Sequence, residues 1–219
     1  MSVPIILAVV AVAVVVVAVV VVAVVLGIVT KRQKDPQRRA AALTRTGAVL
    51  MAVFTVFGGA FIGGYAMEEP GGSAGLTMLL GWAGPVLFLA AIAWFWPAGA
   101  APLLVALTAA FAALCVWFAA DSTMARSFQE VNGPVLAVGV VALAFPAAIL
   151  GLKRTALAGW LLLAVGVLPL LITVLGRSGP IASLAAASVV PLVTGAVYLL
   201  AARMARAGST PENVPTAAV

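Results

Sequence analysis

The chain has 219 residues, of which 65% are hydrophobic and 8% are charged, and its formal net charge is +6. A soluble domain carries roughly 25% charged residues, so 12 basic and 6 acidic side chains are too few to cover a soluble globule of this size. The composition therefore excludes an ordinary soluble domain and favours a protein that resides in lipid. The basic residues lie in short segments between apolar runs, which is typical of topology determinants and not of a nucleic-acid-binding surface.

Several apolar runs reach the roughly 20 residues that cross a hydrocarbon core about 30 Å thick. Because these runs are continuously apolar, they favour helices over the alternating strands of a transmembrane barrel. The sequence predicts an all-α, polytopic transmembrane helix bundle, with a single domain over residues 1–206 and a disordered cytoplasmic tail over 207–219. Seven spans are predicted, at residues 5–29, 46–67, 76–96, 103–120, 135–152, 156–176 and 181–202.

The first predicted span, residues 5–29, contains no polar or charged residue, and 14 of its 25 residues are Val. It is longer than the roughly 7–15 apolar residues of a signal peptide, and the positive charges follow it instead of preceding it. We therefore expect a retained helix with its N-terminus outside the cell.

The segment after this span is strongly basic, with six Lys or Arg residues between positions 31 and 45. Such a segment is expected on the cytoplasmic side, where each basic residue close to the surface gains about 1 kcal/mol from anionic lipids. We predict that this loop contacts anionic lipid headgroups through Lys31, Arg32, Lys34, Arg38 and Arg39.

The second predicted span contains Gly59 and Gly63, a spacing that lets two helix backbones approach closely. We predict that these two glycines pack against a helix, either within the chain or in a second copy. The third span ends in the aromatic cluster Trp94-Phe95-Trp96, which fits the interfacial belt. An uncharged turn is expected over 97–102 and a polar loop over 121–134.

The distribution of charge tests this topology. Positive charge is enriched on the cytoplasmic side of membrane proteins, and with the N-terminus outside only Arg126 and Arg177 are external. The predicted cytoplasmic segments hold the other ten basic residues: Lys31, Arg32, Lys34, Arg38, Arg39, Arg45, Lys153, Arg154, Arg203 and Arg206. The charges therefore favour an odd number of spans and a cytoplasmic C-terminus, although no charge assigns the two spans on either side of residues 97–102.

Several chemistries are excluded by the residues that the chain lacks. There is no histidine, and the one cysteine, Cys115, lies in an apolar run, so histidine- or cysteine-ligated metals, haem and histidine catalysis are excluded. No phosphate-binding loop or hydrolase motif occurs. No charged residue falls inside a predicted span, which argues against an ion-coupled pump or a charged ion filter. We predict no catalytic, cofactor-binding or metal-ligating residue.

The remaining candidates are prolines and hydroxyls within the spans. Pro85, Pro146, Pro169 and Pro191 each remove a helical hydrogen bond and act either as hinges or as ordinary kinks. The residues Ser188, Pro191 and Thr194 share one face of the last span at intervals of three, and they are the candidate substrate-binding residues if a pathway exists.

These features predict an integral membrane protein of the cytoplasmic membrane that is a non-catalytic subunit, scaffold or assembly partner of a membrane complex. The expected partners are the lipid bilayer and other membrane protein subunits, and not nucleic acid. A carrier or flippase-like transporter of a neutral or lipidic solute is the alternative, and an enzyme that uses external acidic residues is a third hypothesis. The preference for Arg, Ala and Val is typical of a bacterial genome rich in G and C.

Overall fold

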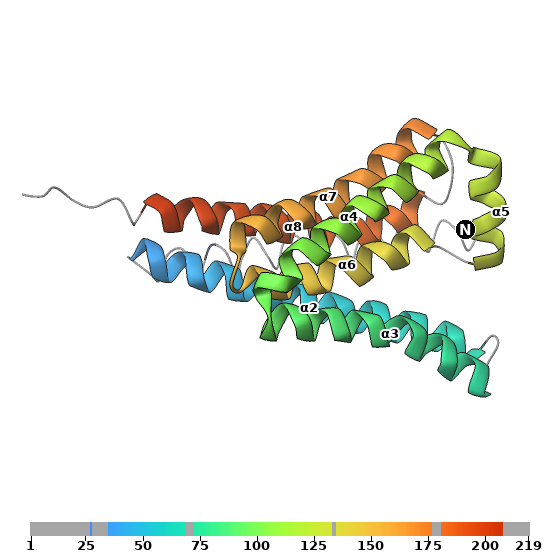
Figure 1. Ribbon diagram of the computed structural model, residues 1–219, viewed down its shortest axis with the longest axis horizontal. Coiled ribbons are helices and arrows are strands. Elements are labelled where there is room, and N and C mark those ends of the chain that lie inside the picture. Colours follow the sequence, from blue (N-terminus) through green and yellow to red (C-terminus); the bar gives the residue numbers. More distant parts are fainter. Residues whose placement is uncertain (1–26, 28–34, 69–71, 133–134, 177–180, 208–219) are drawn as a thin grey trace, which may run out of the picture.

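The computed structural model describes residues 27, 35–68, 72–132, 135–176 and 181–207, and Figure 1 shows their arrangement. The described segments are α-helical, with no strand in these ranges, so the predicted all-α class is confirmed. The predicted first span and Lys31, Arg32 and Lys34 lie outside the described residues, apart from Gly27, as does the tail from residue 208. The helices are α2 (Pro36–Glu68), α3 (Gly72–Phe95), α4 (Pro97–Ala120), α5 (Ser122–Asn132), α6 (Val135–Gly151), α7 (Thr155–Gly176) and α8 (Ile181–Ala207).

Four helical stretches are long and apolar enough to cross a membrane, counted over the described residues. They are Pro36–Ala60 of α2, the whole of α3, the whole of α4, and Ala187–Ala207 of α8. The apolar helices Val135–Gly151 and Thr155–Leu171 are shorter. These helices are those of a membrane protein, whereas the number of spans and their orientation stay predictions.

The helix α2 begins ten residues earlier than the predicted second span, at Pro36 instead of residue 46. The side chain of Asp35 accepts a hydrogen bond of 2.9 Å from the backbone N–H of Gln37, and proline at the first helical position loses no bond that the helix would have made. Arg38, Arg39 and Arg45 therefore lie on a helix, and the expectation that they belong to a loop is wrong.

The expected turn over residues 97–102 is also helical. Only Trp96, with φ −131° and ψ 67°, separates α3 from α4, and α4 starts at Pro97. A proline that ends one helix is compatible with the first turn of the next, because its missing N–H would have had no partner there. The predicted spans 76–96 and 103–120 therefore fall within two helices of 24 residues each, except for Trp96.

The polar segment expected to be a loop contains the helix α5. The Asp121 side chain accepts a hydrogen bond of 2.9 Å from the N–H of Met124, which caps the helix start. Ala125 and Phe128 pack against Phe118 of α4, whereas Thr123, Arg126 and Ser127 are exposed. Figure 1 shows α5 lying across one end of the bundle, steeply inclined to the other helices.

The centre of the bundle is the antiparallel pair α7 and α8, which approach each other through glycine. A methyl group built on Gly159 would lie 3.1 Å from the carbonyl oxygen of Gly195, and one built on Gly195 would lie 3.0 Å from that of Gly159. Around this pair, α2 packs against α8 and α6, α4 packs against α7 and α6, and α3 lies at the edge against α6 and α2.

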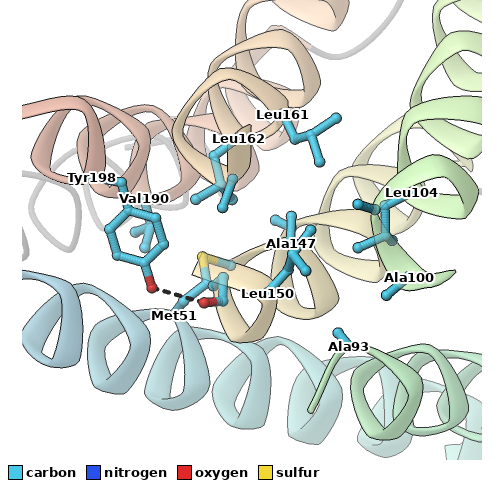
Figure 2. Packing of buried hydrophobic residues seen from close by; sticks show 14 residues of the cluster. Met51, Ala93, Ala100, Leu104, Ala147, Leu150, Leu161, Leu162, Val190 and Tyr198 are labelled. Atoms are coloured by element: carbon cyan, nitrogen blue, oxygen red, sulfur yellow. Dashed lines mark hydrogen bonds between the residues drawn. The ribbon is translucent and has the colours of Figure 1, made fainter. Parts of the chain in front are cut away.

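Tyr198 of α8 joins three helices in the core. Its ring is fully buried between Gly47 of α2 and Gly151 of α6. Its hydroxyl donates a hydrogen bond of 2.9 Å to the carbonyl of Ala148, in the last turn of α6, which is the dashed line in Figure 2. Carbonyl groups in the last turn of a helix have no N–H donor within that helix, so the tyrosine hydroxyl satisfies one of them. Met51 and Leu150 complete this cluster.

Candidate functional site

One end of the bundle collects basic side chains. The start of α2, the turn between α6 and α7, and the end of α8 meet there (Figure 1). Asp35 is the only acidic residue among the described residues of this end, and its carboxylate lies 3.7 Å from Arg38. The described basic residues here are Arg38, Arg39, Arg45, Lys153, Arg154, Arg203 and Arg206, all assigned to the cytoplasmic side by the sequence analysis.

A cavity of about 700 Å³ opens between these segments. Its walls come from the first turns of α2, the last turns of α8, the end of α3 and the turn that joins α6 to α7. Alanines of α2 and α8 line much of it, and their small side chains leave the space open. The polar side chains of the lining are Gln37, Thr44, Arg45, Lys153 and Thr155, and no carboxylate belongs to it.

The two cations of the cavity differ in how they are held. The ammonium of Lys153 donates a hydrogen bond of 2.5 Å to the carbonyl of Trp94 and lies 5.7 Å from the centre of the Trp94 ring. It therefore neutralises the negative C-terminal end of α3 and adds a cation–π contact. Arg45 is exposed and makes no hydrogen bond or ion pair with the described residues. Its guanidinium is free to bind an anion.

The hydroxyls of the lining already donate within their own helices. Thr44 donates to the carbonyl of Ala40 and Thr155 to that of Gly151, each at 2.9 Å. Within the described part of the chain, no group of three or more His, Cys, Asp or Glu residues is placed to hold a metal ion. The lining therefore combines two cationic side chains with neutral polar groups and apolar walls.

The candidate substrate residues Ser188, Pro191 and Thr194 are all buried in α8, away from this cavity. Thr194 faces Gly47 of α2, whereas Ser188 lies beside Gly166 of α7. Ser188 makes this approach through its backbone carbonyl, whereas Thr194 lies against α2 through its methyl group.

Neither of these hydroxyls has a hydrogen-bond partner among the described residues. By contrast, the hydroxyls of four threonines in the described helices donate to the carbonyl four residues earlier: Thr44, Thr55, Thr77 and Thr155. Pro191 lies between Ser188 and Thr194, and its missing N–H leaves the carbonyl of Ala187 without its helical donor. The centre of α8 thus carries unsatisfied polar groups on both sides of a proline.

The glycine prediction concerns α2. A methyl group on Gly59 would lie 3.1 Å from the ring of Trp82 in α3, so this glycine packs within the chain. Gly63 also lies in α2, but its surroundings fall outside the described side chains. The four prolines named from the sequence lie inside helices that continue through them: α3, α6, α7 and α8.

Sequence reasoning assigned Arg45 and Lys153 to one side of the membrane but did not bring them into a common cavity. A signal was present, since every predicted cytoplasmic segment must meet at the same end of an antiparallel bundle. The alanines of α2 and α8 that open the cavity carry no such signal. Comparison with protein-family models, with curated proteins and with solved structures gives no match.

Proposed function

We propose that the protein is a non-catalytic subunit, scaffold or assembly partner of a complex in the cytoplasmic membrane, with other membrane protein subunits as its partners. The observation that carries this proposal is the bare face of α3. Only 18% of the most apolar stretch of α3 is buried inside the protein, against 50% for α8. The edge helix α3 therefore leaves a larger share of its apolar stretch uncovered than α8 does.

The uncovered face of α3 has the composition of a helix interface. Exposed residues recur along it at intervals of three and four: Thr77, Gly81, Gly84, Phe88, Ala91 and Phe95. A methyl group built on Gly81 or Gly84 would meet no atom within 4 Å. Glycine inside a helix costs roughly 0.5–1 kcal/mol relative to alanine, and contact with lipid does not recover this cost. Close approach of a partner helix, which also contacts Phe88 and Phe95 further along the same face, does recover it.

The proposed orientation places the basic end in the cytoplasm, with seven spans, and the described charges support it. The tryptophans support the depth of the protein in the bilayer. Trp96 and Trp117 lie at the two ends of α4, and at 1.5 Å per residue they are roughly 30 Å apart along the helix. This separation matches the hydrocarbon core of a bilayer, whose interfaces are enriched in tryptophan.

The test is the mass of the complex extracted gently from native membranes. We expect a stoichiometric assembly with an unlike chain, and we expect Gly84→Leu to dissociate it, because the added side chain holds the partner helix away. Ala110→Leu on the exposed side of α4 is the matched control and should leave the assembly intact. A lone chain in the wild type, or an assembly that withstands Gly84→Leu, would refute the proposal.

The unpartnered hydroxyls of α8 favour a second candidate, a carrier or flippase-like transporter of a neutral or lipidic solute. Buried hydroxyls without partners beside a proline are the groups that a polar solute would satisfy during passage. If this function holds, vesicles containing the protein will show flux of a neutral solute or lipid, and Ser188→Ala with Thr194→Val will reduce it. Equal flux from empty vesicles would exclude the carrier.

A further inference from the structure

The basic cavity has the depth, charge and walls of a lipid headgroup site. The aromatic cluster at the end of α3 indicates the depth of the cavity in the bilayer. There Trp94, Phe95 and Trp96 are 48%, 80% and 67% exposed. Exposed aromatics of this kind mark the interface between headgroups and acyl chains. Trp94 belongs to the cavity wall, so the cavity opens at the level of the headgroups.

The charge of the cavity selects an anion. Arg45 and Lys153 belong to its lining and no acidic residue does. The arginines of the same end, Arg154 and Arg203 among them, add to a positive potential that the single described carboxylate of Asp35 does not cancel. The first turn of α7 begins at Thr155 on the cavity wall, and the start of a helix carries partial positive charge.

The walls select an anion that is joined to apolar groups. Alanines of α2 and α8 and the ring of Trp94 form most of the surface, and a free inorganic anion gains nothing from such contacts. The volume of about 700 Å³ lies within the usual range for small-molecule sites. It accommodates a phosphate with its glycerol and the start of the acyl chains, while the rest of each chain stays in the bilayer.

We propose that this cavity binds the headgroup of an anionic glycerophospholipid from the surrounding bilayer, with its phosphate on Arg45. The planar guanidinium of Arg45 has no other partner among the described residues, and it pairs with phosphate through two parallel hydrogen bonds. Lys153, tethered to Trp94, adds a second positive charge at a fixed position. Basic pockets between helices on the cytoplasmic side are a known form of lipid site. This site joins α2, α8 and the end of α3, so the bound lipid holds these helices together. The inference does not depend on whether the chain is a subunit or a carrier.

The experiment measures lipid binding to the purified, delipidated protein by native mass spectrometry. Phosphatidylglycerol and phosphatidylcholine with identical acyl chains are the two probes. We expect phosphatidylglycerol to bind more tightly, and Arg45→Gln to weaken its binding roughly tenfold or more, the scale of a lost hydrogen bond to a charged group. Arg45→Lys should restore part of the affinity, because charge returns without the paired hydrogen bonds.

Two controls make the result specific to the cavity. Arg203→Gln removes the same charge from the same end of the bundle but lies outside the lining, and it should change the affinity little. Ala205→Phe fills the cavity without changing its charge, and it should weaken binding as Arg45→Gln does. Equal affinity for both lipids, or equal loss in Arg45→Gln and Arg203→Gln, would overturn the proposal. Displacement of phosphatidylglycerol by millimolar inorganic phosphate would also overturn it, since the site would then select the free anion.

Discussion

The tightest contact of the described core predicts a large effect from the smallest substitution, Gly151→Ala. A methyl group built on Gly151 would lie 2.0 Å from Cε2 of Tyr198 and 2.7 Å from Cδ2. The ring has no room to retreat, because a methyl group on Gly47, on its other side, would lie 2.6 Å from Cε1. The hydroxyl is also held by Ala148 at 2.9 Å. The substitution must therefore displace α6 from α8.

The size of the effect follows from two opposing contributions. Inserting a methyl group into a well-packed core costs about 1–3 kcal/mol, whereas alanine improves helix propensity over glycine by about 0.8–1.0 kcal/mol. The difference between them is a net loss of up to about 2 kcal/mol. The control is Gly81→Ala in α3, where the methyl group meets no atom within 4 Å. There only the propensity applies, so the free energy of unfolding should stay equal or rise.

The assay is reversible unfolding in mixed micelles, with SDS as denaturant and circular dichroism as the signal. A double-mutant cycle with Tyr198→Ala isolates the contact. Tyr198→Ala by itself should cost about 3–5 kcal/mol as a large core truncation, and Gly151→Ala should cost nothing further in that background. Additive losses in the double mutant, or equal stability of Gly151→Ala and Gly81→Ala, would refute the clamping of the ring.

Two of the three further predictions use the same unfolding assay, and the third uses hydrogen exchange. Thr194→Val should leave the free energy of unfolding unchanged or raised, because the buried hydroxyl has no partner among the described residues. Thr44→Val, which breaks a hydrogen bond, is the comparison. A loss above about 1 kcal/mol in Thr194→Val would contradict this prediction, because it would show that the hydroxyl has a partner. Gly195→Leu should destabilise by more than about 2 kcal/mol, since Gly159 leaves no room; a neutral result would contradict the close approach of α7 and α8. Asp121→Ala should reduce helical content in α5 by removing its cap, measured by hydrogen exchange, and unchanged protection would refute this.

The apolar runs predicted the helices because a backbone in lipid must satisfy its own hydrogen bonds. The errors occurred where polar or proline residues interrupt these runs. Pro97 was interpreted as a turn, although the first position of a helix accepts proline, so a break of one residue at Trp96 suffices. The polar segment after Asp121 was interpreted as a loop because it is too hydrophilic to span. Its apolar residues Ala125 and Phe128 need only one side of a short helix to reach Phe118.

The sequence predicts the chemical character of the candidate residues but not which of them lie together. The sequence separates the basic residues from the predicted spans, since charge is excluded from the apolar core, but it places Arg45 in a loop, whereas Arg45 lies on α2. Only the three-dimensional arrangement joins Arg45 with Lys153, which follows it by more than 100 positions. Ser188 and Thr194 share a face by spacing alone, yet Thr194 faces α2 and Ser188 lies by α7. A spacing of six residues on one helix therefore does not give two residues the same neighbouring helix.

The Gly59 and Gly63 spacing did not predict where two helix backbones approach each other. The four-residue spacing of Gly59 and Gly63 predicts close backbone packing at α2, but Gly59 contacts the ring of Trp82 and not a backbone. The backbone contacts occur between α7 and α8. Gly159 and Gly166 are seven residues apart on α7, and Ser188 and Gly195 are seven residues apart on α8, with Gly159 against Gly195 and Gly166 against Ser188. Seven residues are almost two full turns of a helix, so each pair forms a stripe of small residues along one side. Two such stripes in antiparallel helices meet along their length at a shallow crossing angle. For antiparallel neighbouring helices, small residues that lie seven positions apart in both helices are therefore the more informative pattern.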